Sequence, residues 1–430
     1  MRLFFTLLFV VIIAQFKYSQ GYTSFFTGNP NDVQVTPNFG ICLMGGATEN
    51  DQAMIWLLQK ANGGDVVVLR TSGTDGYNNY FYSQLGINVN SVETLVITSV
   101  AGATNPYVLD KVAKAELIWL AGGNQATYVN FFKNNALGDL LNEHVNQKNA
   151  PIGGASAGMA ILGSHYYSAL NNSVTSAQAL ANPYHSNMTL GANDFLLFPW
   201  MENTITDTHF DNPDRRGRLT TFLARFQADN GVKVRGIACE EFSAVCIEAN
   251  GQARVFGSFP NFQDYAYFVQ ANCEINAIPQ QVLLNQPLQW NYSSGALKVY
   301  KVPGTNAGQN YFSLNDWQNG TTAGGAWEHW NVVNGVFQSV SGSAPQNCTL
   351  NIDEAEVLAI QVYPVPVTDR IFLTGIQPKS NYQIIDLNGR IISSGETDNS
   401  IKFTAPKGMY LLKIWDANGV LKSTFKFTKN

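Results

Sequence analysis

Short apolar runs alternate with helical segments between residues 40 and 154, and this alternation limits the possible folds more than any other feature of the chain. The segments between the runs, such as 51–61 and 106–115, have the apolar spacing of helices. Strands that are apolar on both faces and separated by helices are typical of a parallel sheet covered on both sides. The pattern predicts an α/β fold with a doubly wound, mostly parallel sheet, whose chemistry lies at the carboxyl ends of its strands. The predicted strands are residues 40–44, 65–70, 92–99, 116–121 and 151–154.

The character of the chain changes twice after this region. Beyond about residue 260 the helical spacing is lost and Trp, Tyr, Asn and Gly become frequent, which predicts β-structure that completes a first domain over residues 21–350. From residue 355 to 430 short apolar runs recur at regular intervals, and Asn388-Gly389 is a strong hairpin turn. We therefore expect a separate, small C-terminal β-sandwich over residues 355–430.

The N-terminus has the pattern of a secretory signal peptide. Arg2 supplies a positive start, residues 3–14 are almost wholly apolar, and polar or small residues follow at 19–21. The apolar run is shorter than the roughly 20 residues that a membrane span needs, so a signal peptide over residues 1–20 is favoured over a membrane anchor. Charged residues make up only 13% of the chain and the net charge is −5, which argues against a nucleic-acid partner.

Five cysteines are too few for the fold to depend on a disulfide framework. Cys273 and Cys348 lie in polar surroundings and could form a bridge, and Cys239 and Cys246 could pair across a short acidic turn. Cys42 lies in an apolar run, which favours a buried, free thiol. The sequence contains no CxxC and no HxxxH, so we expect neither a zinc site nor another metal or organic cofactor.

The clearest chemical signal is the segment 154–158, which reads Gly-Ala-Ser-Ala-Gly. It follows a predicted strand and precedes the apolar stretch 159–162, which we expect to be helical, and this is the context of a nucleophile elbow. Glycines allow the sharp turn that exposes the hydroxyl of Ser156, and the amide of Ala157 at the helix start can donate to an oxyanion. The alternative is a glycine-rich turn with an incidental serine.

A serine nucleophile needs a base, and elimination favours His209. It lies in the segment 207–210, which reads Asp-Thr-His-Phe, just before a helix that contains several arginines. The other four histidines lie on an ordinary amphipathic helix, on the expected elbow helix, in an Asn-rich loop and in the β-rich region. They are His144, His165, His185 and His329.

Two adjacent carboxylates could orient this base. Glu240 and Glu241 follow the apolar run 234–238, so they end a predicted strand, and the spacing alone does not favour one over the other or exclude a solvated acidic turn. The chain order Ser, His, acid differs from the order Ser, acid, His of ordinary α/β-hydrolases.

These segments together resemble the cyanophycinase-like serine peptidases, which are relatives of aspartyl dipeptidase (dipeptidase E). The resemblance covers roughly residues 38–260 and implies a class I glutamine amidotransferase-like sheet. Its motifs, in chain order, are Gly-Gly-Ala at 45–47, Gly-Gly-Asn-Gln at 122–125, the segments 154–158 and 207–210, the pair Arg215 and Arg218, and Gly-Ile-Ala-Cys-Glu-Glu at 236–241.

The resemblance implies a role for each matching residue. Ser156 is implied as the nucleophile, His209 as its base and Glu241, at the sixth position of its motif, as the orienting acid. Backbone amides near Gly123 and Ala157 are expected to hold the oxyanion. The residues implied around the substrate are Gln125, Asp207, Arg215 and Arg218.

Two departures bear on the substrate. The family's D-Q-H-F has Thr208 in place of its glutamine, and Pro213 stands where cyanophycinases carry another arginine. Both missing groups are expected to bind the Asp–Arg unit of cyanophycin. We therefore expect serine peptidase chemistry on aspartyl-type peptide or isopeptide bonds, with poor cleavage of cyanophycin itself.

The tail resembles the C-terminal sorting domain of type IX secretion substrates from Bacteroidetes. The resemblance rests on Val-Tyr-Pro-Val-Pro-Val-Thr-Asp at 362–369, with Val365 in place of the usual asparagine, on Asp-Leu-Asn-Gly-Arg at 386–390 and on Lys-Gly-Met-Tyr at 407–410. It implies export across the inner and outer membranes, the type IX machinery as a partner, and a secreted or cell-surface protein.

The sequence therefore predicts an exported serine hydrolase with a sorting tail. One alternative is a non-catalytic cell-surface binding protein that keeps the peptidase fold, which the aromatic-rich stretch 317–330 would support. Another is an amidase that acts on non-peptide substrates.

Overall fold

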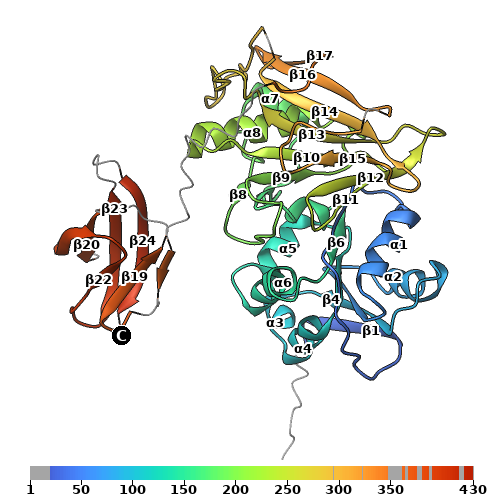
Figure 1. Cartoon of the computed structure of the whole chain (residues 1–430), viewed down its shortest axis with the longest axis horizontal. Helices are drawn as coiled ribbons and strands as arrows, with labels where there is room; N and C mark the ends of the chain where they lie inside the picture. The colour runs from blue at the N-terminus through green and yellow to red at the C-terminus, as the bar shows by residue number, and fades with distance from the viewer. Residues whose placement is uncertain are drawn as a thin grey trace, which may run out of the picture. The chain divides into compact units, whose positions relative to one another are not determined.

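The computed structural model divides the chain into two compact units, Met1–Asn347 and Cys348–Asn430, which are described separately (Figure 1). It describes residues 20–346 except 294 and 322, and residues 361–429 except 364–366, 375–379, 387–389 and 416–420. The expected signal peptide, apart from Gln20, and the expected boundary at residues 350–355 lie outside the described residues. Within the described part of the chain, no helix is both long and apolar enough to cross a membrane.

Five parallel strands form the centre of a nine-stranded sheet in the first unit. Nearly every side chain of these strands is buried because helices cover both faces, which explains the continuous apolar runs in the sequence. Antiparallel strands extend both edges. In spatial order the strands are β1 (Tyr22–Gly28), β4 (Ser91–Ile97), β3 (Asp65–Arg70), β5 (Leu117–Leu120), β6 (Ile152–Ala155), β2 (Ile41–Met44), β11 (Ala244–Ile247), β12 (Gln252–Phe259) and β15 (Asn310–Ser313).

Figure 1 shows helices α1 and α2 on one face of this sheet and α3 to α6 on the other. Leu57, Leu58 and Phe81 fill one interface, and Val108 and Leu141 belong to the core on the other face. The unit is therefore mixed α/β, and its assignment to the doubly wound class stays a prediction. The helices are α1 (Asp51–Lys60), α2 (Gly76–Asn79), the π-helical turn η1 (Tyr80–Gln84), α3 (Val100–Ala103), α4 (Pro106–Lys114), α5 (Gln125–Phe132) and α6 (Ala136–Asn146).

The helical spacing over residues 125–141 corresponds to two helices rather than one. Asn134 has a φ of 60°, in the left-handed region, which interrupts the helix after α5. Asn135 then caps α6, because its side chain accepts a hydrogen bond from the Leu137 amide. Apolar periodicity continues through the break and therefore hides it in the sequence.

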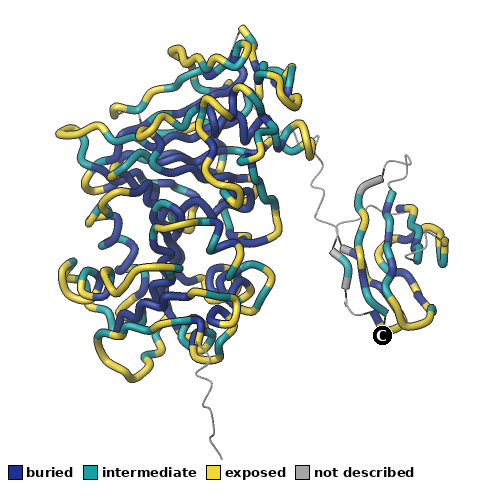
Figure 2. The backbone as a smooth tube through the Cα atoms, turned by 180° about the vertical axis from the view of Figure 1, so that it is seen from behind, coloured by how far each residue is buried: buried dark blue, intermediate teal, exposed yellow. Residues whose placement is uncertain are grey.

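A second, eight-stranded sheet was not predicted. It combines the strands on either side of α8 with most of the β-rich segment after residue 260. Its inner strands, like those of the first sheet, are mostly buried, whereas the strands toward its edges are partly or largely exposed (Figure 2). Helix α8 packs Leu219, Phe222 and Phe226 into the core of this sheet. The elements are β17 (Val336–Ser341), β16 (Ala326–Val333), β14 (Leu297–Pro303), β13 (Tyr265–Ala271), β10 (Arg235–Cys239), β9 (Thr204–Asp207), β7 (His165–Tyr167) and β8 (Leu190–Ala192) in spatial order, with helices α7 (Ser176–Ala181) and α8 (Arg216–Asn230).

The C-terminal unit is built from two small antiparallel sheets around one apolar core. Ile371, Ile384, Leu412 and Phe427 are among the core residues, and they come from both sheets. This is the β-sandwich-like arrangement that the regular strand spacing predicts. The strands are β18 (Gln361–Tyr363), β19 (Arg370–Thr374) and β22 (Ser400–Lys402) in one sheet, and β21 (Ile391–Thr397), β20 (Ser380–Asp386), β23 (Gly408–Trp415) and β24 (Leu421–Lys429) in the other.

The suggested pairing of Cys239 with Cys246 is wrong for this structure. Both are free, buried thiols, and they lie on β10 and β11, which belong to different sheets. Cys42 is also a free, buried thiol. Cys273 is disulfide-bonded, and Cys348 lies outside the described residues.

Candidate active site

The turn after β6 holds Ser156 in a strained conformation. Its φ is 50°, a left-handed value that is uncommon for residues other than glycine, and its amide donates to the Met44 carbonyl at 3.0 Å. A Cβ on Gly158 would lie 1.9 Å from the Leu120 carbonyl oxygen, and one on Gly154 would lie 2.6 Å from the Gly158 carbonyl carbon. Gly158 is therefore required by the close approach of the turn to β5, and Gly154 by the close approach of the turn to itself.

The expected helical stretch over residues 159–162 is present only as one short turn, and the expectation that it extends to His165 is wrong. Only a short 3-10 helix, η2 (Met159–Ile161), follows the serine, and His165 lies on strand β7 instead of a helix. A single turn carries little macrodipole, so the amide of Ala157 must act on an oxyanion as an individual donor.

His209 lies directly between a hydroxyl and a carboxylate. Its Nε2 is 2.8 Å from the Oγ of Ser156, and its Nδ1 is 2.6 Å from an Oε1 oxygen of Glu241. The histidine has a φ of 44° and its amide donates to the Gly45 carbonyl at 2.9 Å, so the backbone fixes the ring at the end of β9. The side chains of His209 and Glu241 are 24% and 20% exposed, which leaves the group accessible from one side.

The structure separates the two adjacent glutamates. Glu240 accepts hydrogen bonds from the Tyr267 hydroxyl at 2.7 Å and from the Tyr265 amide at 2.8 Å, so it joins β10 to β13. Burial raises the pKa of the Glu240 carboxyl group. Glu241 faces His209, and its own amide donates to a carboxylate oxygen of Asp211 at 3.0 Å. The geometry thus agrees with Glu241 as the partner of the histidine.

Gly46 forms the surface on which the ring of His209 lies, and Gly45 packs against the backbone of Glu240. A Cβ on Gly46, whose φ is 130°, would lie 2.3 Å from Nε2 of His209 and 2.4 Å from its Cε1. A Cβ on Gly45 would lie 2.1 Å from the Glu240 carbonyl oxygen. The sequence shows this glycine pair only as part of a motif, and the contact of Gly46 with the ring was not predicted.

Two backbone amides next to Ser156 have no acceptor within the described residues. Those of Gly123 and Ala157 take part in none of the backbone hydrogen bonds outside helices and strands. A Cβ on Gly122 would lie 3.7 Å from that of Ser156, which places the 122–125 turn beside the serine. Gln125 begins α5 and is half-buried. These positions can bind a polar group next to the hydroxyl.

The acidic and basic residues expected around a substrate differ in whether they form an ion pair within the protein. Arg218 and Asp207 form a bidentate ion pair with side chains 5% and 3% exposed, and one of its bonds measures 2.9 Å. Arg215 donates to the Thr208 carbonyl at 2.8 Å, while its buried Nε has no hydrogen-bond partner in the described part of the chain. Burial, followed by the charge of Arg218, lowers the pKa of Arg215. Direct substrate contact by any of these side chains stays a prediction.

A hollow of about 470 Å³ is lined by Phe242, the residue after Glu241, but not by Ser156, His209 or Glu241 themselves. It is bounded by the start of α1, from Thr48 to Gln52, together with Phe242, Ser258 and Asn306. Phe242 directly follows Glu241, has a φ of 63° and is 48% exposed. An exposed aromatic ring held in this conformation next to the carboxylate can form one wall of a substrate site.

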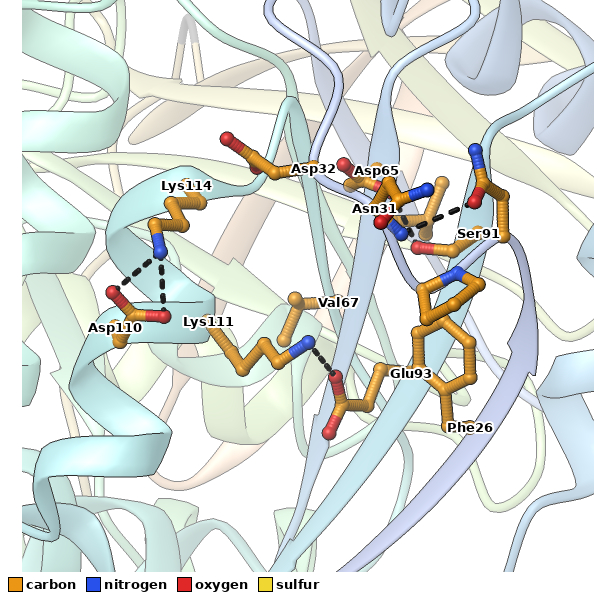
Figure 3. Close-up of a pocket in the computed structure, with 13 residues that line it drawn as sticks. Phe26, Asn31, Asp32, Asp65, Val67, Ser91, Glu93, Asp110, Lys111 and Lys114 are labelled. Carbon is orange, nitrogen blue, oxygen red and sulfur yellow. Dashed lines mark hydrogen bonds and ion pairs between the residues drawn. The ribbon is translucent and has the colours of Figure 1, made fainter.

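A second hollow, of about 100 Å³, lies at the opposite edge of the first sheet, where β3 and β4 begin (Figure 3). Two ion pairs line it: Lys111 lies 3.1 Å from Glu93, and Lys114 lies 2.8 Å from Asp110. Among the described residues, no group of His, Cys, Asp and Glu side chains could hold a metal ion. The lysines of the hollow are therefore already engaged in ion pairs within the sheet edge.

Comparisons with known proteins match a different family model to each of the two units of the chain. Residues 72–251, which contain Ser156, His209 and Glu241, match the model described as Peptidase family S51, and residues 361–429 match the model described as Secretion system C-terminal sorting domain. Cyanophycinases of Synechococcus elongatus and Thermosynechococcus vestitus are each 25% identical to the chain over 194 residues, which is 44% of this chain. The match covers 55% of each cyanophycinase, so the chain spans about half the length of these relatives.

Among the solved structures found to be similar are two described as peptidases. A peptidase from an acI-B1 Actinobacterium is 16% identical, with a TM-score of 0.39 over 52% of this chain and 90% of the other. A putative peptidase E protein from Listeria monocytogenes is 15% identical, with a TM-score of 0.35 over 51% of this chain and 98% of the other. The family models carry the assignment: the chain contains a peptidase family S51 domain and a C-terminal type IX secretion sorting domain, and the latter indicates export to the cell surface or the surroundings.

Proposed function

We propose that the chain is an exported serine-type peptidase in which Ser156 is the nucleophile, His209 its general base and Glu241 the acid that orients the base. The observation that carries this proposal is the continuous line of hydrogen bonds from hydroxyl to imidazole to carboxylate, at 2.8 and 2.6 Å. The three side chains follow three different strands, β6, β9 and β10, from two sheets. A serine with a left-handed φ at the end of a strand adds to this support.

In the proposed reaction, Nε2 of His209 takes the hydroxyl proton while Oγ of Ser156 attacks the carbonyl carbon of the scissile bond. The carboxylate of Glu241 accepts a hydrogen bond from the N–H group at Nδ1 and stabilises the imidazolium that forms. The imidazolium then protonates the leaving nitrogen, and the acyl-enzyme remains. A water molecule, activated by the same nitrogen, releases the acid and restores the serine.

The developing oxyanion is assigned to the amides of Gly123 and Ala157. Their freedom from backbone acceptors supports this assignment, because an amide already bonded within the chain could not donate. Each such donor contributes roughly 10²–10³-fold to the rate in comparable sites. Since no long helix follows Ser156, these two donors act without the support of a macrodipole.

For the substrate we propose a peptide or isopeptide with an aspartyl-type carboxylate beside the scissile bond. Arg215 supports this because its guanidinium is half-buried beside Thr208 and forms no ion pair within the described residues. Arg218 is neutralised by Asp207, so in this proposal Arg215 supplies the charge that binds the substrate. The changes at Thr208 and Pro213 favour poor cleavage of cyanophycin.

The C-terminal sorting domain indicates which partner handles the protein during export. We propose that the type IX secretion machinery handles the C-terminal unit during export. The apolar cores of the two units contain no residues in common, which supports a peptidase that is active without its tail.

Hydrolysis of three matched peptides tests the function. Aspartyl, asparaginyl and alanyl versions of one short substrate are compared with wild type, Ser156→Ala and the control Ser83→Ala, whose side chain lies on an exposed turn. We expect rapid release only from the aspartyl peptide, complete loss in Ser156→Ala and no change in the control. Binding without cleavage would favour a non-catalytic binding protein, and cleavage of non-peptide amides alone would favour an amidase.

A further inference from the structure

Two buried cysteines face each other across neighbouring strands of the first sheet. Cys42 on β2 and Cys246 on β11 are antiparallel partners in the strand register. Their sulfur atoms lie 3.6 Å apart, and both side chains are fully buried. Neither residue has a part in the proposed catalysis, so the reason for this pairing lies elsewhere.

The register places the pair at a position that suits a disulfide. The amide of Gly45 donates to the Ser243 carbonyl at 2.9 Å, so that pair is hydrogen-bonded and the pairs alternate from it along the ladder. Counting three residues along each strand makes Cys42 and Cys246 a non-hydrogen-bonded pair. Such pairs have Cα atoms about 4.5 Å apart, within the range of roughly 4.4–6.8 Å found in disulfides. Closing the gap between the sulfur atoms to about 2.0 Å requires mainly rotation of the two side chains.

The neighbouring strand packs closely against the pair, which requires a glycine at position 153. Gly153 on β6 lies beside Cys42, and a Cβ at that position would be 2.9 Å from the Cβ of Cys42. Cys239, the third buried thiol, is on β10 in the other sheet, where its sulfur points to the Leu43 carbonyl at 3.5 Å. It has no register partner in β2 or β11, so we do not expect it to form the bond. It can therefore serve as a buried-thiol control for Cys42 and Cys246.

The compartment supplies the oxidant. The sorting domain indicates export, and Cys273 is already disulfide-bonded, so the chain passes through an environment in which disulfides form. We propose that Cys42 and Cys246, which are free thiols in this structure, become joined by a disulfide bond in the exported protein. This inference does not depend on the proposed catalytic function.

The bond forms by exchange with the disulfide of a protein or small-molecule oxidant. One thiolate attacks that disulfide and forms a mixed disulfide, and the second thiolate then displaces the oxidant as a dithiol. The two cysteines lose two protons and two electrons, and the oxidant's disulfide gains them. Burial raises the pKa of the Cys246 thiol, so the exchange belongs to folding, before the strands close over the sulfur atoms.

The bond would join the strands that lead to the catalytic group. β2 runs into Gly45 and then Gly46, the residue on which the ring of His209 lies, and β11 follows Glu241 by a turn. A link between these strands also closes a very long loop of chain, which is the case in which a disulfide restricts the unfolded state most. We expect the oxidised form to have a melting temperature several degrees higher than a form without the bond.

Peptide mapping of the full chain tests the proposal. The protein is secreted without reductant, unfolded in guanidinium with N-ethylmaleimide, and digested. We expect a reductant-sensitive cross-linked peptide that contains Cys42 and Cys246, together with alkylated Cys239. The bridge at Cys273 is the internal control for exposure to oxidant. Alkylation of both Cys42 and Cys246 in a sample whose Cys273 is bridged would overturn the proposal.

A second measurement covers the effect on stability. Melting temperatures with and without reductant are compared for wild type and for Cys42→Ala/Cys246→Ala, with Cys239→Ala as the matched buried-thiol control. We expect reductant, added under conditions that unfold and refold the chain, to lower the melting temperature more in wild type and Cys239→Ala than in the double variant. An equal reduction in all three would contradict the proposed bond. If the double variant fails to fold, the peptide map of wild type still decides.

Discussion

Replacing Gly46 by alanine should disable the catalytic group without removing any of its functional atoms. The new Cβ would lie 2.3 Å from Nε2 of His209, 2.4 Å from Cε1 and 2.9 Å from Cδ2, far inside van der Waals contact. The ring must therefore move, and Nε2 is the atom that lies 2.8 Å from Oγ of Ser156. The substitution also places a side chain at a φ of 130°, which costs about 1–3 kcal/mol of strain.

The expected loss follows from what a general base contributes. Displacing the base from the hydroxyl should cost about 10²–10⁴-fold in kcat/KM, whereas the strain should lower the melting temperature only moderately. The assay is hydrolysis of the aspartyl peptide together with thermal unfolding followed by circular dichroism. Gly76→Ala is the matched control, because a Cβ at Gly76 would meet nothing within 4 Å. A folded Gly46→Ala protein with kcat/KM within about threefold of wild type would refute the role assigned to this contact.

Three further predictions address stability, specificity and pH. Arg218→Met leaves the Asp207 carboxylate buried and unpaired, so it should lower the free energy of unfolding by about 3–5 kcal/mol in urea titrations, whereas Arg216→Ala, which removes an exposed ion pair, should cost less than about 1 kcal/mol. Arg215→Ala should reduce the aspartyl-over-asparaginyl ratio of kcat/KM by roughly 10- to 150-fold, and an unchanged ratio would exclude Arg215 as the carboxylate ligand. Burial raises the pKa of Glu116 to about 7, so the folded state holds a proton that the unfolded state releases, and stability should fall as the pH rises from about 4.5 to 7. Glu116→Gln should remove on the order of 2 kcal/mol of this fall, measured as the free energy of unfolding at several pH values.

Local patterns predicted the parts of the site that depend on short segments. The turn around Ser156 could be predicted because its glycines are needed by a backbone approach within one strand–turn unit. His209 could be reached by elimination because the chain has only five histidines. The C-terminal unit could be predicted because regular strand spacing and a strong turn are properties of the sequence itself.

Other features depend on contacts between distant segments, which spacing does not encode. Which glutamate faces the histidine is decided by Tyr265 and Tyr267 on β13, which bind Glu240 and leave Glu241 free to turn toward the ring. Cys239 and Cys246 are seven positions apart, yet the chain passes from one sheet to the other between them. Sequence reasoning that assumed one sheet could not detect this change.

The pairing of Arg218 with Asp207 shows the same limit. A motif identifies both residues as candidates to bind a substrate, because charged side chains near a catalytic histidine are common ligands. Helix α8 brings the arginine back to the end of β9, where the two charges neutralise each other in a buried site. Of Asp207, Arg215 and Arg218, only Arg215 has no ion-pair partner among the described residues.

Covalent labelling of the serine tests the central proposal most directly. The folded protein is treated with a fluorophosphonate, and the adduct is located by intact mass and peptide mapping. We predict one adduct per chain, on Ser156, with labelling strongly slowed in His209→Ala and absent in Ser156→Ala. Absence of labelling in wild-type protein that hydrolyses its substrate, or an adduct on a different serine, would contradict the assignment of Ser156 as a nucleophile activated by His209.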